Sequence, residues 1–397
     1  MSVVAQILAV TAMSLRSVPQ RFGNSLVIVV GIAGVVAVLV PVLAMSVGFR
    51  ATVKGDARAD RAIVLTRGAT TEYESSLSRE SMASVMNAPG IKHDARDKPI
   101  VSAEVILVAP VARKRDDSDV NVTLRGVGGQ YFVMRPELKL VSGRMFRTGN
   151  QELVVGAAAR AQFAGLELGN QVRLQDGDWI VVGTFAGGNG SRESEVIADA
   201  QTVMSAYKLD AFNSVSVGLE SATSFTKLRE ALTGDPTLLV DARTEPEYLA
   251  TASHSINRML QLVAYAIGSI MALGALFGAL NSMHSAVAAR AVETATLRAI
   301  GFTSTAVAVA VLLEAFLLAL LGAAVGVAIA YAAVDGTTIS TLGGAALWDS
   351  QLVYALTITP SLVVTAILLA CTLGLLGGIF PAIRAARANV ADALRET

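Results

Sequence analysis

The sequence contains almost no cysteine. Cys371 is the single one, and it lies inside an apolar run. One thiol cannot form an internal disulfide framework or a thiolate metal cluster. The three histidines are scattered without the spacing of metal ligands. A Gly-x-x-x-x-Gly-Lys-Ser/Thr sequence is also absent, which excludes nucleotide binding by a P-loop in this chain.

Charged residues are scarce as well. They make up 16% of the sequence, whereas 53% of the residues are hydrophobic. Because soluble domains are about one quarter charged, this composition indicates a membrane protein. The formal net charge of zero gives no reason to expect a nucleic acid partner.

Long apolar runs are the main feature that is present. Residues 22–49, 259–289, 303–334 and 351–381 contain a single charged residue between them, Glu314. Each run exceeds the roughly 20 residues that a helix needs to cross a bilayer, so we expect four transmembrane helices. Because a charge in the bilayer is costly, Glu314 is expected to face protein or water. It would snorkel, pair across a subunit boundary or belong to a proton or transport path.

The arginines around these runs predict the orientation. One set of flanks and termini holds Arg16, Arg21, Arg290, Arg298, Arg384, Arg387 and Arg395, whereas the short opposite loop, residues 335–350, has no Lys or Arg. The positive-inside rule therefore places both termini, including the tail 382–397, in the cytoplasm. Residues 50–258 and the loop 335–350 are then outside.

Residues 1–21 are apolar with basic residues and no acidic residue. A secretory signal peptide has its positive charges before the apolar stretch, but here they follow it. We therefore interpret residues 1–21 as an amphipathic helix in the cytoplasmic interface, broken by Pro19.

Residues 50–258 have a mixed α and β pattern. Strands are predicted at 62–66, 100–111, 120–127, 152–155, 179–185, 214–219 and 238–241, and helices at 78–86 and 225–232. Strand–helix–strand units at both ends of the segment flank a β-rich middle. We therefore expect one α/β domain interrupted by another. From Pro246 the pattern is helical and continues into the second apolar run as a stalk.

A short charged island, residues 290–302, separates the second and third runs. Val292, Ala295, Ala299 and Ile300 recur at helical spacing, and Gly301 is a C-terminal stop signal. A short helix between two spanning helices is well suited to transmit force, because a push on it moves both spans.

Small residues recur four apart in three of the runs, at Gly274/Gly278, Gly322/Gly326 and Gly374/Gly378. Such faces allow helices to approach closely in lipid. The competing interpretation is ordinary flexibility of glycine-rich spans.

Several of these segments resemble a known family. Gly278-Ala-Leu-Asn-Ser-Met283, Arg290, the island sequence Glu293-Thr-Ala-Thr-Leu-Arg-Ala-Ile-Gly301 and the ending 380–394 resemble the FtsX-like permease domain of MacB-type exporters and LolC/LolE-type lipoprotein releasers. Residues 141–146, 166–169 and 179–183 are similar to the MacB-type periplasmic domain.

The resemblance implies a type VII ABC-transporter permease in the bacterial inner membrane. Its fold would be an α-helical membrane protein with four transmembrane helices and a large α+β periplasmic domain, a MacB-like porter domain with an inserted β-rich subdomain. Residues 290–302 would be a coupling helix that contacts an ATPase. By match to the family motif, the contact residues are Glu293, Thr294, Leu297, Arg298 and Gly301.

The resemblance also implies partners. Only about twenty residues precede the first span, so we expect the ABC ATPase to be a separate chain that binds the ATP, with no cofactor in this one. The permease would pair with a second copy or a sister permease, with the first two spans near the dimer axis. Membrane lipid surrounds it. A periplasmic adaptor and an outer-membrane tunnel are further candidates.

Two further functions remain open. Within the same family, the permease would serve lipoprotein release or regulate a cell-wall hydrolase. In a different class, the chain would be a membrane-anchored sensor or an enzyme with a catalytic outer domain. The sequence offers no convincing nucleophile–base or metal set for the last of these, so we do not expect an enzyme.

Overall fold

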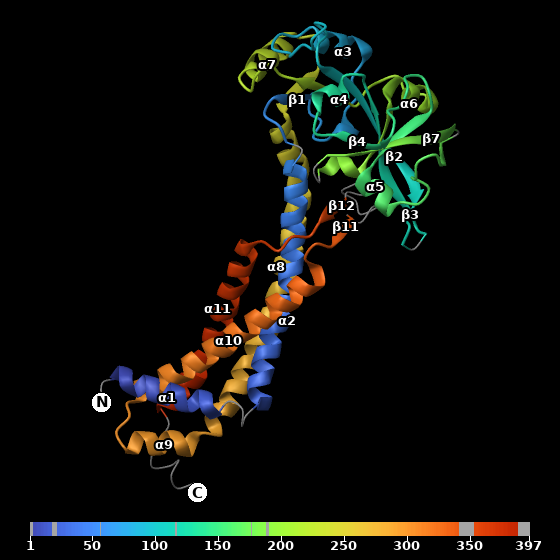
Figure 1. Cartoon of the computed structure of the whole chain (residues 1–397). Coiled ribbons are helices and arrows are strands. Elements are labelled where there is room, and N and C mark those ends of the chain that lie inside the picture. Colours follow the sequence, from blue (N-terminus) through green and yellow to red (C-terminus); the bar gives the residue numbers. More distant parts are fainter. Residues whose placement is uncertain are drawn as a thin grey trace. The chain divides into compact units, whose positions relative to one another are not determined.

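The computed structural model describes residues 3–17, 22–55, 57–115, 117–175, 177–187, 190–340 and 353–387. The chain divides into two compact units (Figure 1). The helical unit comprises Met1–Val47, Met259–Thr337 and Leu356–Thr397, and the sheet unit comprises Gly48–Arg258 and Thr338–Ala355.

Four helices dominate the helical unit: α2 Phe22–Gly55, α8 Glu245–Ala288, α10 Ser304–Val334 and α11 Pro360–Arg387. Among the described residues, these four are long and apolar enough to cross a membrane. The expectation of four long apolar helices is therefore confirmed. Two shorter helices, α1 Val3–Ser17 and α9 Ala291–Ala299, complete this unit.

Two of the long helices extend further than their apolar runs. Helix α2 continues past Arg50 to Gly55, because a charged residue ends an apolar run without disfavouring the helix. Helix α11 continues through Pro381 to Arg387. Proline removes only one backbone donor, and burial of Ala382 and Ala385 stabilises the turns that follow it.

The fourth long helix begins later than its apolar run. It starts at Pro360 instead of near residue 351, and Val353–Ala355 form strand β12, antiparallel to β11 Thr338–Ser340. Valine and tyrosine favour strands, and an apolar run alone does not distinguish a strand from a helix.

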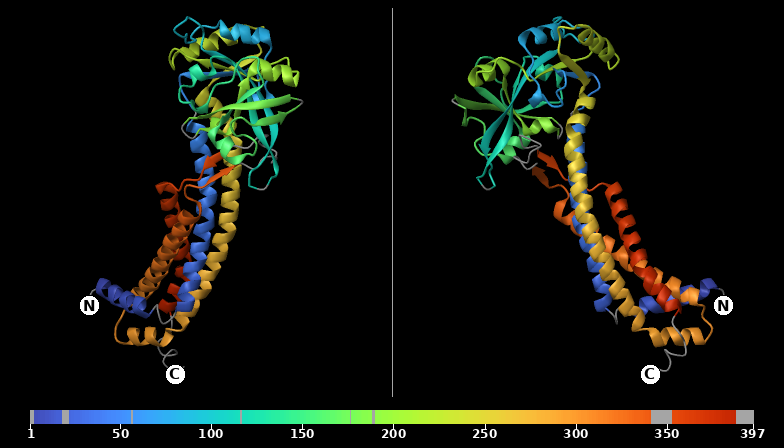
Figure 2. Two further views of the ribbon diagram at one scale, coloured as in Figure 1. Left: turned by 45° about the vertical axis from the view of Figure 1, so that its right-hand side comes forward. Right: turned by 180° about the vertical axis from the view of Figure 1, so that it is seen from behind.

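Glycines bring the long helices together. A methyl group added at Gly326 would lie 2.7 Å from the carbonyl oxygen of Ala33 in α2, and one at Gly374 would lie 2.4 Å from the Ala319 Cβ in α10. Accordingly, α10 and α11 lie side by side in every view (Figure 2). In contrast, nothing lies within 4 Å of the same position at Gly274 or Gly278.

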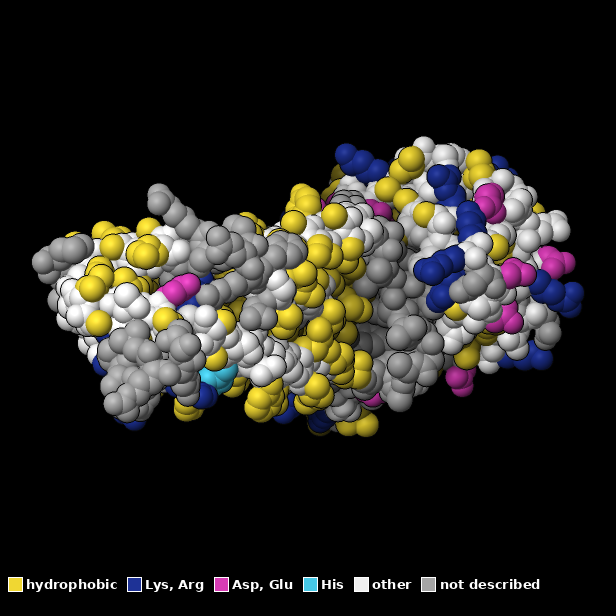
Figure 3. Space-filling view, turned by 90° about the horizontal axis from the view of Figure 1, so that it is seen from below, with side chains coloured by type: hydrophobic (Ala, Val, Ile, Leu, Met, Phe, Trp, Pro, Cys, Tyr) yellow, Lys and Arg dark blue, Asp and Glu magenta, His cyan; other side chains and the backbone are white. Residues whose placement is uncertain are grey.

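The surface of the helical unit is rich in exposed hydrophobic side chains, visible in yellow in Figure 3. On α8 they include Leu262, Ile270, Leu273 and Phe277, of which Ile270 is 72% exposed. Large exposed apolar faces in soluble proteins mark contact surfaces, and on a helix of this length they fit contact with lipid or another helix.

The sheet unit is built around ten strands in the order β10-β1-β9-β2-β3-β8-β5-β7-β4, with β6 paired to β7. The strands are β1 Arg61–Thr66, β2 Val101–Ala112, β3 Asp119–Val127, β4 Lys139–Gly143, β5 Glu152–Gly156, β6 Gln171–Leu174, β7 Gly177–Ala186, β8 Val196–Asp199, β9 Ser214–Gly218 and β10 Val240–Thr244. Short helices cover it: α3 Arg79–Met86, α4 Tyr131–Met134, α5 Ala157–Gln162, α6 Ala200–Tyr207 and α7 Ser224–Gly234, with 3₁₀ turns η2 Glu72–Glu74 and η3 Ser191–Ser194.

The two ends of the long segment meet in this sheet. Strand β1 pairs with β10, Ala62 opposite Thr244, and also with β9, which comes late in the chain. The pairs β3–β8 and β5–β7 are parallel, whereas the other pairs of the large sheet are antiparallel. The unit is thus an α+β domain whose first and last strands are neighbours.

Candidate functional site

The island between α8 and α10 forms a short helix with a well-defined end. Helix α9, Ala291–Ala299, follows Arg290. At its C-terminus, Gly301 donates its N–H to the Arg298 carbonyl and Phe302 donates to the Leu297 carbonyl. This is a Schellman motif, and the φ of +103° at Gly301 explains why glycine occupies that position.

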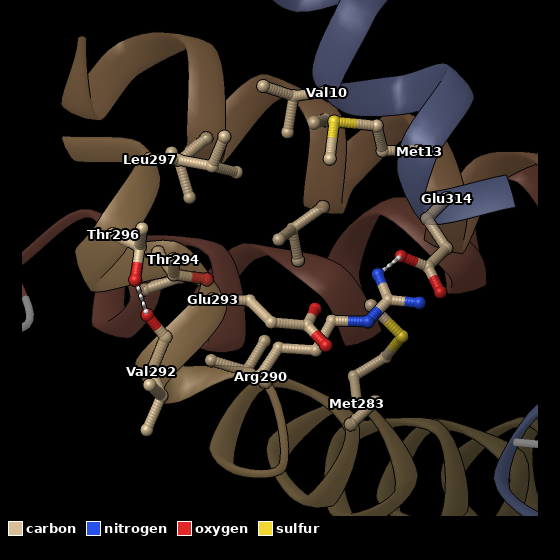
Figure 4. Close-up of a pocket in the computed structure, with 16 residues that line it drawn as sticks. Val10, Met13, Met283, Arg290, Val292, Glu293, Thr294, Thr296, Leu297 and Glu314 are labelled. Carbon is tan, nitrogen blue, oxygen red and sulfur yellow. Dashed lines mark hydrogen bonds and ion pairs between the residues drawn. The ribbon is translucent and has the colours of Figure 1, made fainter. Parts of the chain in front are cut away.

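The five residues expected to contact an ATPase do not share one environment. Glu293 and Gly301 are exposed, whereas Thr294, Leu297 and Arg298 are half-buried. Figure 4 shows Leu297 among the side chains that line a cavity.

Two exposed apolar residues of α9 were not among the expected contacts. Val292 is 41% exposed and Ile300, just after the helix, is 69% exposed. Both residues belong to the apolar positions that recur at helical spacing in the sequence. From that spacing alone, such positions are expected to be packed against the protein and not exposed. The side of α9 that packs inward instead carries the small residue Ala295, which is 3% exposed.

A cavity of about 500 Å³ lies behind α9 (Figure 4). Five helices contribute to its wall: α1 through Val10 and Met13, α8 through Met283, α9 through Leu297, α10 through Val311 and α11 through Ala385. The wall is mostly apolar, and its charged members are Arg290, Glu293 and Glu314.

Glu314, the charged residue of the third apolar run, is paired within the chain. Its Oε2 lies 3.0 Å from Nη1 of Arg290, and the two side chains are 6% and 11% exposed. The structure thus places Glu314 against protein, as expected, and brings it together with an arginine from the island. Snorkelling, a contact across a subunit boundary or a transport path is not needed to explain its burial.

Helix α1 is attached to the turn that follows α9. The Gln6 Oε1 accepts hydrogen bonds from the N–H and the hydroxyl of Thr303, each at 3.2 Å. Thr303 also caps α10 by accepting a hydrogen bond from the Ala306 N–H. Val10 is buried, whereas Leu8 and Met13 are 65% and 57% exposed, as in an amphipathic helix.

The sheet unit contains a buried charge cluster around Arg125. This guanidinium contacts the carboxylates of Glu72, Glu104 and Glu195 at 3.0, 2.6 and 2.7 Å. Burial alone would raise the pKa of Glu72, but Arg125 and Arg192 outweigh it and lower that pKa to about 2. The cluster joins β2, β3 and the segments before β8 and after β1. It therefore connects the β1–β2 side of the sheet to the β3–β8 side.

A second buried cluster holds the first residue of α8. The Glu245 carboxylate accepts hydrogen bonds from the Arg58 N–H at 3.2 Å and from Arg135 Nη2 at 2.9 Å. Arg61 lies 3.5 Å from it and pairs with Glu137 at 2.7 Å. One turn later, the Tyr248 hydroxyl accepts a hydrogen bond from the Glu72 N–H. The start of α8 is therefore firmly attached to the domain.

Within the described parts of the chain, His, Cys, Asp and Glu side chains do not gather in any group of three or more suited to a metal ion.

Comparisons with known proteins agree with these observations. Residues 24–235 match the model of the MacB-like periplasmic core domain, and residues 265–390 match the FtsX-like permease C-terminal model. The first match covers more than half of the chain. A search among curated proteins gave no significant match.

Two solved structures are similar to the chain at low identity. The periplasmic region of MacB from Actinobacillus actinomycetemcomitans is 17% identical, with a TM-score of 0.37 over 47% of this chain and 89% of that one. The extracellular domain of the noncanonic ABC-type transporter YknZ from Gram-positive bacteria is 16% identical, with a TM-score of 0.35 over 46% of this chain and 99% of that one.

Proposed function

Because the chain belongs to the MacB/FtsX family of ABC-type permeases, we propose that it couples ATP hydrolysis by a separate ATPase to work on a substrate outside the cytoplasm. The observation that carries this proposal is α9, a capped helix joined at both ends to long apolar helices. An ATPase that moves α9 would displace α8 and α10 together.

The proposed orientation follows the arginine distribution. The four long helices would span the bacterial inner membrane, with both termini and α9 in the cytoplasm. The sheet unit would be periplasmic, with the porter domain and inserted subdomain of the MacB type. The ATP would be bound by the partner, and this chain would need no cofactor.

The proposed ATPase contact combines the family-matched residues with the exposed ones. Glu293 and Gly301 would meet the ATPase directly, together with Val292 and Ile300, because these positions are exposed. Leu297 would support the helix from behind, since it is half-buried at the cavity, whereas Val292 and Glu293, which also line the cavity, are exposed. Thr294 and Arg298 would contribute at the edge of the contact.

The test is co-purification of an ABC ATPase with the permease. Removing an aliphatic side chain that is buried in a docking groove costs about 1.5–3 kcal/mol. Ile300→Ala should therefore weaken ATPase binding roughly tenfold, and Glu293→Arg should weaken it similarly. Leu239→Ala removes an equally exposed leucine from the sheet unit and should leave binding unchanged.

Unaltered ATPase binding by both Ile300→Ala and Glu293→Arg would show that α9 is only a connector. Failure of any ABC ATPase to bind the unaltered permease would contradict the proposal as a whole.

A further inference from the structure

We propose that the ion pair between Arg290 and Glu314 is a strut that sets the position of α9 on α10, and that ATP-driven force passes through it. The inference rests on the proposed function, because it assigns to Arg290 and Glu314 a role in force transmission by α9. Both would be positioning residues, acting through α9 and not by touching the ATPase.

The position of the ion pair in the fold allows it to act as a strut. Arg290 is the residue before α9, whereas Glu314 lies ten residues beyond the start of α10 at Ser304. At 1.5 Å per residue, that is about 15 Å along the helix axis. The 3.0 Å contact therefore spans from the start of α9 to the interior of α10. It closes a triangle whose other sides are α9 and the first turns of α10.

Without this third side, α9 would be held mainly at its two ends and by the packing of Ala295. The connection to α8 is the short turn before Arg290, and the connection to α10 passes through Gly301, whose φ is +103°. The cavity of about 500 Å³ behind α9 means that dense packing does not fix the helix from that side. A triangle closed by a charge pair resists the hinge motion that these turns permit.

The chemistry of the contact also fits a strut. Both side chains are largely buried, at 11% and 6% exposure, so their charges are poorly screened by solvent. Removing one charge would leave the other buried without its partner, which is strongly unfavourable. Glu293 also lines the cavity, but it is exposed, so its charge is better screened by solvent than that of Glu314. Arg290 and Glu314 thus remain together as α9 moves.

The first experiment needs no ATPase. In a Cys371→Ser background, spin labels at Thr296→Cys in α9 and Thr372→Cys in α11 report the distance between these helices, with labelled chains diluted among unlabelled ones. Both positions are exposed. Glu314→Gln preserves the size of the side chain and should broaden the distance distribution. The exchanged pair, Arg290→Glu with Glu314→Arg, should narrow it again.

The second experiment measures the ATPase rate per bound complex. Glu314→Gln should reduce stimulation of the ATPase at least roughly fivefold, the lower range of coupling between sites. Binding of the ATPase should stay within about twofold, the scatter expected for an uncoupled site. Arg384→Gln removes an exposed arginine near the end of α11 and serves as the control for loss of charge.

A distance distribution that is unchanged in Glu314→Gln would overturn the proposal, whatever the ATPase result. Loss of protein yield with an unchanged rate per complex would also overturn it, because the pair would then only support folding. In contrast, absence of ATPase binding to the unaltered chain would contradict the proposed function. The spin-label test of the strut would still be valid, because it needs no ATPase.

Discussion

Arg144 shows how single residues of the family-like segments stabilise the sheet unit. Its guanidinium donates two hydrogen bonds to the Glu152 carboxylate, each at 2.7 Å. The hydrogen bond from Arg144, together with one from the Arg147 N–H, lowers the pKa of Glu152 to about 2. The preceding Gly143 has a φ of +76°, and a methyl group there would lie 2.3 Å from the Val182 carbonyl oxygen. These residues attach the end of the edge strand β4 to the start of β5 and, through the Arg144 N–H and the Val182 carbonyl, to β7.

The first prediction is a pH-dependent contribution of Glu152 to stability. Its pKa is lower in the folded protein than the value of about 4.3 in an unfolded chain. The contribution is therefore complete above that value and is lost as the pH falls toward 2. Glu152→Gln should lower the stability of the sheet unit at pH 7, and the difference from the unaltered protein should shrink below about pH 4.

The measurement is denaturant unfolding followed by the fluorescence of the buried Trp179, in a Trp348→Phe background. Glu230→Gln alters an exposed glutamate in α7 and serves as the control for the loss of one carboxylate. A constant difference between Glu152→Gln and the unaltered protein from pH 7 to the acid range would contradict the assigned hydrogen bonds.

The sequence indicates some of the residues of the candidate site but not the residues with which they pair. Glu314 is conspicuous because it is charged within an apolar run, whereas the sequence indicates Arg290 only as a cytoplasmic flank and as part of the family-like motif. Their contact depends on the geometry of two turns, which periodicity does not specify. The contacts of the buried Arg125 cluster are likewise not predictable from the sequence, because its members come from four separate segments.

At the scale of the elements, the glycine faces differ in what they contact. Gly322 and Gly326 pack on α2, and Gly374 and Gly378 pack on α10, so these faces serve close helix contacts. Among the described residues, nothing lies within 4 Å of a methyl group added at Gly274 or Gly278. If the first two spans lie near a dimer axis, as the resemblance implies, this face of α8 would be available to a second permease.

The second prediction separates folding from dimerisation. Gly326→Leu should destabilise the monomer, because overpacking costs about 1–3 kcal/mol or more. Gly278→Leu has open space around it and should leave monomer stability unchanged while it weakens the dimer. Thermal unfolding reports the first property and cross-linking in nanodiscs the second. A Gly326→Leu variant as stable as the unaltered chain, or an unaffected Gly278→Leu dimer, would refute the assignment.

The elements were predicted best where the signal was long. The four apolar helices and strands such as β2 and β3 follow directly from runs of apolar residues. Strands β4, β6 and β8 are not among the predicted strands: β4 and β6 mix charged or polar residues with apolar ones, and β8 has only four residues. Helix α7, Ser224–Gly234, is present where the sequence predicts a helix at 225–232. Pro19 lies outside the described residues.

At the scale of the whole molecule, the orientation in the membrane remains a proposal that rests on the arginines. The third prediction tests it by labelling intact cells with a membrane-impermeant thiol reagent in a Cys371→Ser background. Asp117→Cys, in the hairpin between β2 and β3, should react, whereas Thr294→Cys in α9 should not. Labelling of position 294 from outside would reverse the orientation and remove the basis for an ATPase contact.

The pairing of β1 with β10 has a consequence for how such chains diversify. Adjacent strands lie about 4.8 Å apart, so the segment from β1 to β10 begins and ends at nearly the same place, as Ala62 opposite Thr244 shows. A segment with adjoining ends can be replaced by another of different length without separating the helices that flank it. The segment from β1 to β10 is therefore suited to exchange as a unit by recombination, with the flanking helices left in place.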